Sequence, residues 1–316
     1  MVVLIHHYLH LPFSSPSLSL SYHSSSKRPR VRISASSSSS PMDRQNRRRG
    51  GYVDFPHLSA QHRELMLDLV STVETRLESD LLPSSLSPDV QYFENESGNS
   101  QAALHIRSGD KASPIDLVLG SWIHCELPSG ALDITTISAY LKSSTDAPRF
   151  LIEFLQSSPT SLILILDLPP RKDLVLHQDY LDTFYGDTQL DKRRQELAKV
   201  PEVRPYFSSS LYIRCVCSPT AILVSINCEA GGEGRMEEII RDHVGPVAKE
   251  VLGIWLDRCA CGGRVVEVHE RADLEMRDRL IKKKTIEIDL GSSLPRLFGP
   301  DVAGRVLEAI RDAFNT

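Results

Sequence analysis

The chain has 316 residues, of which 41% are hydrophobic and 24% charged, a composition typical of a globular protein with a substantial core. No apolar run approaches the roughly 20 residues that a helix needs to cross a bilayer, so we do not expect an integral membrane protein. Beyond residue 41 the chain carries 32 basic and 41 acidic residues, and this net charge of −9 argues against general nucleic-acid binding.

The first 41 residues differ from the rest of the chain. They contain no Asp or Glu, four basic residues and fourteen serines, a composition typical of organelle transit peptides. The apolar start is short and precedes the basic cluster, which argues against a secretory signal. We predict a plastid transit peptide over 1–41, with mitochondrial import as the second choice and a merely disordered tail as the alternative. A basic linker over 42–58 and a single domain over 59–316 follow.

The first half of the domain predicts one helix and then a series of strands. Met66, Leu69 and Val73 recur at helical spacing after Ser59, and Pro83 marks the end of the helix. Strand-like segments follow at residues 102–107, 115–126, 134–141, 150–155 and 162–168. The links between them are short, which favours antiparallel neighbours.

The second half is mainly helical. We predict helices over 178–200, 236–258, 273–284 and 302–314, the second of them bent at Gly245-Pro246, and two more strands over 211–216 and 221–227. The glycines of 231–234 are read as a flexible loop. The order of helix, antiparallel sheet and helices predicts an α+β fold, a three-layer α/β/α sandwich with a central antiparallel sheet.

Cofactor motifs are absent from the sequence. No G-x-G-x-x-G follows a strand, and no G-x-x-x-x-G-K-[ST] occurs. Four of the six cysteines form two C-x-C pairs, which lack the spacing of zinc or iron–sulfur ligands. We therefore predict reduced cysteines and no metal site.

Glu153 lies in an otherwise apolar segment, residues 150–155, and a second apolar run follows at 162–166. Strand side chains alternate between faces, so Glu153 shares a face with Leu151 and Leu155. A carboxylate on such a face must be paired, face a wet cavity or take up a proton. The alternative is an edge-strand glutamate that points to solvent.

Several longer strings resemble a known family. They are HIRSGDK at 105–111, PID at 114–116, GSWIHC at 120–125, LILDLP at 164–169, RKDLVL at 171–176, IEIDL at 286–290 and PR at 295–296. From about residue 52 to the C-terminus the chain resembles red chlorophyll catabolite reductases, plant enzymes of chlorophyll breakdown.

The resemblance implies a ferredoxin-dependent reduction of red chlorophyll catabolite, an open-chain tetrapyrrole, to primary fluorescent chlorophyll catabolite. It also implies a bilin-reductase-like fold, a homodimer in the chloroplast stroma and no bound cofactor. Contact with other chlorophyll-breakdown enzymes such as pheophorbide a oxygenase is a further expectation. The alternative function is a non-catalytic protein that sequesters a phototoxic tetrapyrrole and hands it on.

The resemblance also implies site residues. Glu153 and Asp289 match two acidic positions beside the substrate, where carboxyls orient it and supply protons. From pattern alone, residues 286–290 look extended, with Asp289 and Glu287 together on one face, and an exposed acidic strand edge is the alternative.

Four further residues complete the predicted substrate site. Tyr206, Phe207 and Ser208 match a stretch that borders the pocket, with ordinary packing aromatics as the alternative. Cys217, expected on the following strand, stands where relatives can carry a bulkier apolar residue, which leaves the product's stereochemistry open.

The densest positive cluster outside the N-terminus is the predicted docking site for acidic ferredoxin. Its members are Arg277, Arg279, Lys282, Lys283 and Lys284. The alternative is the solvated face of a charged helix.

Overall fold

The computed structural model describes residues 54–128, 130–262 and 266–315, so the predicted transit peptide and most of the linker lie outside it. One antiparallel sheet runs through the molecule in the order β1-β2-β3-β4-β5-β6-β8-β7. The strands are β1 (Tyr92–Glu94), β2 (Ser100–Ser108), β3 (Ile115–Leu127), β4 (Gly130–Leu141), β5 (Phe150–Ser158), β6 (Ser161–Asp167), β7 (Val203–Pro205) and β8 (Ile222–Asn227). Every pairing is between antiparallel strands, as predicted.

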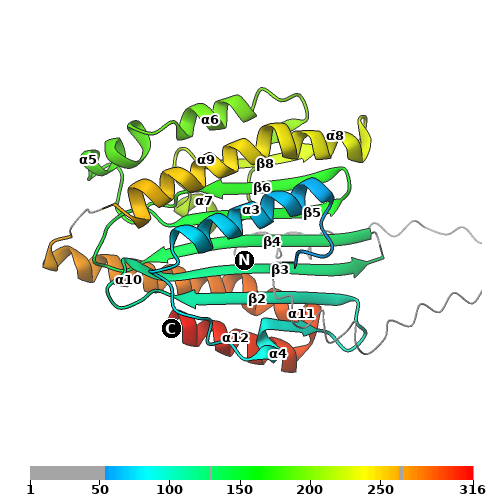
Figure 1. The fold of residues 1–316 in the computed structure, drawn as a ribbon, viewed down its shortest axis with the longest axis horizontal. Helices are drawn as coiled ribbons and strands as arrows, with labels where there is room; N and C mark the ends of the chain where they lie inside the picture. Colours follow the sequence, from blue (N-terminus) through cyan, green and yellow to red (C-terminus); the bar gives the residue numbers. More distant parts are fainter. Residues whose placement is uncertain (1–53, 129, 263–265, 316) are drawn as a thin grey trace, which may run out of the picture.

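One face of the sheet is covered by a helical layer that lies in front of it in Figure 1. Its members are α3 (Ala60–Arg76), α5 (Gln178–Leu181), η2 (Asp182–Gly186), α6 (Leu190–Leu197), α8 (Gly232–Ile239), η3 (Ile240–Val244), α9 (Gly245–Trp255) and η4 (Leu256–Ala260). Apolar side chains of α3, α9 and the sheet form one core, in which Trp255 is fully buried and its indole N–H donates to the carbonyl of Pro148 at 3.0 Å.

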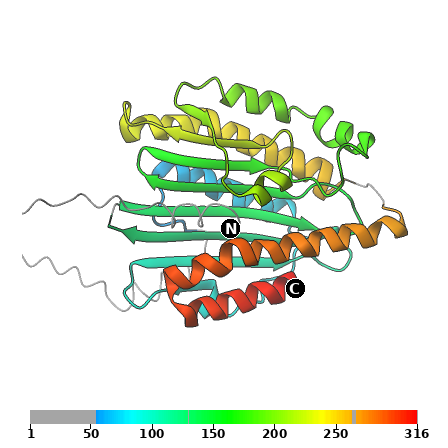
Figure 2. The ribbon, with the colours of Figure 1, turned by 180° about the vertical axis from the view of Figure 1, so that it is seen from behind.

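The opposite face carries the second helical layer, seen in front of the sheet in Figure 2. It consists of α4 (Pro88–Gln91), α7 (Leu211–Val216), α10 (Val268–Thr285), η5 (Ile286–Leu290), α11 (Gly291–Phe298) and α12 (Pro300–Phe314). Its apolar residues and those of the facing strands form a separate core. The sheet between two helical layers confirms the predicted sandwich.

The prediction of a strand over 211–216 is wrong, because this segment is the helix α7. The Ser210 hydroxyl accepts a hydrogen bond from the Ile213 N–H and caps the helix. The other predicted strand, 221–227, is confirmed as β8, which pairs with β6 and β7. Residues 231–234 also differ from prediction, since α8 begins at Gly232, whose φ of +68° suits glycine.

The predicted bend near Gly245-Pro246 corresponds to the π-helical turn η3 just before it. Proline has no N–H and its ring crowds the carbonyl four residues earlier, here that of Asp242. A wider turn avoids this conflict while the helix continues into α9.

Candidate active site

Glu153 lies at the centre of β5, between two other strands. Thr136 of β4 and Ile165 of β6 are its direct neighbours, and Leu223 of β8 is opposite Ile165. Directly opposed residues share a face, so these four form one row beneath α7 and α10–α12. Glu153 is 1% exposed, and the Thr136 hydroxyl donates to its Oε2 at 3.1 Å. The alternative of a solvent-facing edge glutamate is therefore wrong.

Asp289 belongs to η5, a helical turn, so the prediction of an extended segment is wrong. In a helix, positions three and four apart share a face. Ile286, Asp289 and Leu290 are therefore buried together, while Glu287 is exposed. Asp289 is 1% exposed, which also excludes an exposed acidic edge.

Glu153 and Asp289 lie on the same side of the sheet, in the core between the sheet and the second helical layer. The flanking residues of Asp289 pack in the core that contains Ile165, the strand neighbour of Glu153. A rigid central strand thus carries one acid, and the helices that cover it carry the other.

A second row of the sheet, next to the first, opens into a cavity of about 50 Å³. Ser138, Leu151 and Asp167 are opposed across β4, β5 and β6 and line this cavity. Residues of α7 and α10 complete the walls. Because Glu153 is two residues from Leu151 on the same strand, the cavity and the glutamate share one face.

Asp167 is a third buried carboxyl that was not predicted as a site residue. It accepts hydrogen bonds from the Ser218 N–H at 2.9 Å and from the Ser218 hydroxyl at 2.5 Å. Burial raises the pKa of Asp167 to about 6, although these hydrogen bonds oppose the shift. The available signal was the acid that ends the apolar run 162–166, the same pattern that singled out Glu153.

A larger hollow of about 410 Å³ lies beside this cavity, at the β7 and β8 edge of the sheet. Tyr206, Phe207, Ser208 and Cys217 all line it. The Tyr206 N–H donates to the carbonyl of Leu223 at 2.9 Å, Ser208 is buried, and Phe207 is 80% exposed. The structure therefore brings the four predicted residues together, next to the row that contains Glu153.

Cys217 does not lie on a strand as predicted, because it caps the C-terminal end of α7. From this position it lines both the small cavity and the larger hollow. Burial raises the pKa of the Cys217 thiol to about 12, which keeps it neutral and unreactive. Its side chain is therefore an apolar part of the wall between the two spaces.

The family model of red chlorophyll catabolite reductase (RCC reductase) matches residues 61–312. The chain belongs to the red chlorophyll catabolite reductase family. The chloroplastic red chlorophyll catabolite reductase of Arabidopsis thaliana is 53% identical over 276 residues, 86% of each chain. Red chlorophyll catabolite reductase 1, chloroplastic, of Oryza sativa subsp. japonica is 48% identical over 255 residues, which cover 80% of this chain and 78% of that one.

A solved structure shares the fold of this RCC reductase family member. The crystal structure of phytochromobilin synthase from tomato in complex with biliverdin superimposes with a TM-score of 0.59 at 17% identity. The match covers 80% of this chain and 84% of that one. The predicted bilin-reductase-like α+β fold is thereby confirmed.

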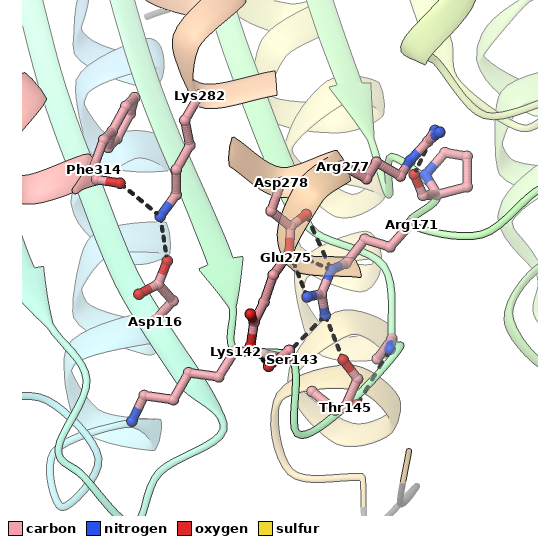
Figure 3. A network of polar contacts seen from close by, with 12 residues as sticks. Asp116, Lys142, Ser143, Thr145, Arg171, Glu275, Arg277, Asp278, Lys282 and Phe314 are labelled. Atoms are coloured by element: carbon pink, nitrogen blue, oxygen red, sulfur yellow. Dashed lines mark hydrogen bonds and ion pairs between the residues drawn. The ribbon is translucent and has the colours of Figure 1, made fainter. Parts of the chain in front are cut away.

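The five basic residues predicted as a ferredoxin site do not form one surface in this RCC reductase family member. Lys282 is 6% exposed, and its Nζ lies 2.5 Å from Asp116 and 3.4 Å from the carbonyl of Phe314 (Figure 3). Lys282 faces inward because α10 lies on the sheet. Its ion pair with Asp116 holds α10 against the sheet, and so does the ion pair between Arg171 and Asp278 of α10.

The other four residues of the cluster are more accessible. Arg277 is half-buried and donates to the carbonyl of Pro170 at 3.2 Å. Arg279 is exposed, and so are Lys283 and Lys284, whose Nζ atoms lie 3.6 and 2.7 Å from Glu287. Only Arg279, Lys283 and Lys284 present charge at the surface.

Among the described residues, no group of three or more His, Cys, Asp or Glu side chains is arranged to hold a metal ion. The six cysteines are free thiols. Within the same ranges, no helix has both the length and the apolar character needed to span a membrane.

Proposed function

We propose that this chain reduces red chlorophyll catabolite to primary fluorescent chlorophyll catabolite, with reduced ferredoxin as the electron donor and no bound cofactor. The observation that carries the proposal is the burial of Glu153 on a central strand, in the layer that also holds Asp289, in a chain of this family. The fold shared with a biliverdin-bound phytochromobilin synthase supports a linear tetrapyrrole as the ligand.

The chemistry needs two electrons and two protons for each double bond reduced. Ferredoxin transfers one electron at a time, and the conjugated tetrapyrrole delocalises the added electron, so the substrate acts as its own redox centre. Glu153 and Asp289 orient the substrate and supply the protons. The hydroxyl of Thr136 donates to one oxygen of Glu153 and so helps to fix the orientation of this carboxyl.

The decisive experiment combines the mature protein with red chlorophyll catabolite, ferredoxin and a ferredoxin-reducing system. Loss of the red colour together with a gain of blue fluorescence supports the reductase. Tight binding without turnover favours the alternative, a protein that sequesters the pigment.

Substitutions of the two acids test their role. Proton donors typically contribute about 100-fold or more to the rate, so Glu153→Gln and Asp289→Asn should each lower kcat by roughly that factor. Kd for the substrate should change less than about threefold, because shape and hydrogen-bonding capacity are largely kept. Glu308→Gln, on the exposed side of α12, is the matched control and should leave both values unchanged. An equal loss of kcat and of binding would count against proton donation.

The setting of the reaction is part of the proposal. We place it in the chloroplast stroma, supported by the transit-like residues 1–41 and by relatives named chloroplastic, and we keep mitochondrial import as a second site. A homodimer and contact with other chlorophyll-breakdown enzymes such as pheophorbide a oxygenase are further parts of the proposal.

Ferredoxin docking is proposed at the exposed basic end of α10. Arg279, Lys283 and Lys284 lie just before η5, so a donor bound there is brought toward Asp289. Charge reversal at Lys283 should raise KM for ferredoxin at low salt, and the effect should shrink as salt screens the charges. A KM that does not respond to either change would exclude this surface.

A further inference from the structure

Arg149 is a buried cation that forms no ion pair with a carboxylate in the part of the chain that the structure describes. Its side chain comes from the residue just before β5 and lines the small cavity, yet Arg149 is only 6% exposed. Among the described residues, its guanidinium makes no ion pair or hydrogen bond, and its Nε is fully buried. The face of the Tyr140 ring lies 5.5 Å away and gives only partial compensation.

Asp167, the acid of the cavity, is close enough for the charge of Arg149 to oppose the rise of its pKa, but the two side chains form no ion pair. Both oxygens of Asp167 accept hydrogen bonds from Ser218, one from its N–H and one from its hydroxyl. Burying an unpaired charge is costly, and proteins that keep one usually pair it with a ligand or a metal. A guanidinium favours an anionic ligand, because it repels a metal ion.

Tyr212 supplies a second donor to the same cavity. Its hydroxyl is buried and, within the described part of the chain, has no hydrogen-bond partner. Burial raises the pKa of Tyr212 to about 12, although the nearby charge of Arg149 opposes the shift, so the hydroxyl keeps its proton at neutral pH. The guanidinium of Arg149 and the hydroxyl of Tyr212 can therefore each donate a hydrogen bond to one oxygen of a carboxylate.

We propose that Arg149 and Tyr212 bind a carboxylate of the tetrapyrrole, and so determine which end of the substrate enters the cavity. This inference rests on the proposed function. The cavity of about 50 Å³ fits a carboxylate-bearing side arm rather than the body of a tetrapyrrole, since pockets for whole ligands measure roughly 300–1,000 Å³. The adjoining hollow of about 410 Å³, which shares Cys217 with the cavity, has the size for the body.

The spacing along β5 suits a positioning role. Arg149 is four residues before Glu153, so the two lie about 13 Å apart on one face, at roughly 3.3 Å per residue. A substrate held by its carboxylate at Arg149 therefore places a distant carbon, rather than the carboxylate itself, next to Glu153. In this arrangement Arg149 is a positioning residue, and Glu153 acts on the reacting atoms.

The experiment compares red chlorophyll catabolite with a derivative in which every free carboxylate is esterified. Binding to the full-length mature protein is followed by absorbance titration for the wild type, Arg149→Met, Arg149→Lys and Tyr212→Phe. Arg63→Met, which removes an exposed arginine from α3 in the opposite helical layer, is the control for the loss of one positive charge. Circular dichroism checks that each variant is folded.

The wild type should bind the free acid roughly 10- to 100-fold more tightly than the ester, as expected for a charge-assisted hydrogen bond to a buried guanidinium. Arg149→Met should abolish this preference while its Kd for the ester stays within about threefold of the wild type. Arg149→Lys should retain part of the preference, and Tyr212→Phe should reduce it about three- to tenfold.

The outcomes separate the two proposals. A wild type without preference for the acid, or an Arg149→Met variant that keeps the preference, overturns the anchor but leaves the reductase intact. If Arg149→Met does not fold, Tyr212→Phe decides alone, because a preference unchanged by the loss of that hydroxyl overturns the anchor. A wild type that binds neither form refutes the proposed function, and the anchor with it.

Discussion

Asp167→Asn should change how the stability of the protein depends on pH. The carboxyl of Asp167 has a pKa near 3.8 when unfolded and about 6 when folded, because burial disfavours its charge. Between these values the folded state binds the proton that the unfolded state has lost, so this group stabilises the fold increasingly as pH falls. From pH 7 to pH 5 the gain is about 1.3 kcal/mol, worked from these two pKa values.

His62, on the other face of the sheet, acts in the opposite direction. Its ring is fully buried, 3.3 Å from the Gln156 Oε1 and 3.4 Å from the Thr135 hydroxyl, and burial lowers its pKa from 6.5 to about 4. Here the unfolded state takes up the proton first, so stability falls as pH falls through 6.5. The same pH step costs about 1.8 kcal/mol. In the wild type the contributions of Asp167 and His62 to the free energy of unfolding nearly cancel, so the pH dependence of the wild type alone shows neither of them.

Urea unfolding of the wild type, Asp167→Asn and His62→Gln at pH 7 and pH 5 separates the two groups. Relative to the wild type, the change in unfolding free energy over this step should be lower for Asp167→Asn and higher for His62→Gln, each by about 1–2 kcal/mol. The three proteins need not have equal unfolding free energies at pH 7, because the comparison uses only the change in each protein's unfolding free energy between pH 7 and pH 5. If the three proteins respond to pH in parallel, the buried environments assigned to these side chains are wrong.

Two neighbouring lysines should behave differently although both were predicted to dock ferredoxin. Lys282→Met breaks a largely buried ion pair with Asp116 and should lower the unfolding free energy by about 1–3 kcal/mol in urea titrations. Lys283→Met should change it by less than about 0.5 kcal/mol, since this side chain is 61% exposed. Cys217→Phe adds bulk where the cavity meets the hollow, so it should raise KM for the tetrapyrrole and alter the stereoisomer ratio of the product on chiral chromatography. An unchanged KM and an unchanged ratio would show that the substrate does not pass this position.

The strands between residues 102 and 168 were predictable because their apolar runs are long and the turns between them are short. The helical turn at 286–290 was not predictable from the sequence. Its apolar residues alternate, which fits a strand, but over five residues this pattern also fits a helical turn, and only packing against the sheet decides between them. The prediction of a strand over 211–216 was wrong for a similar reason, since a run of six residues fits either structure and the Ser210 cap is a weak local signal.

The candidate site was predicted in part. Glu153 was recognisable because a charged residue interrupts an apolar strand, whereas Asp289 and the Tyr206 stretch came from family resemblance. Arg149 and Asp167 stand at the ends of apolar runs, where polar residues ordinarily meet solvent. Their burial results from α7 and α10, which cover these strand ends from distant parts of the chain, and no local pattern shows that.

The helix α10 links the parts of the site that the proposed function requires. Its inward side is fixed by Lys282 with Asp116 and by Arg171, whose guanidinium pairs with Asp278 and also donates to the carbonyl of Thr145 at 2.5 Å (Figure 3). Its outer side carries the exposed lysines, and its end continues directly into the turn that holds Asp289. These ion pairs therefore fix the helix that leads into Asp289, the proposed proton donor. Their loss should reduce turnover through misplacement of Asp289, even where ferredoxin affinity is kept.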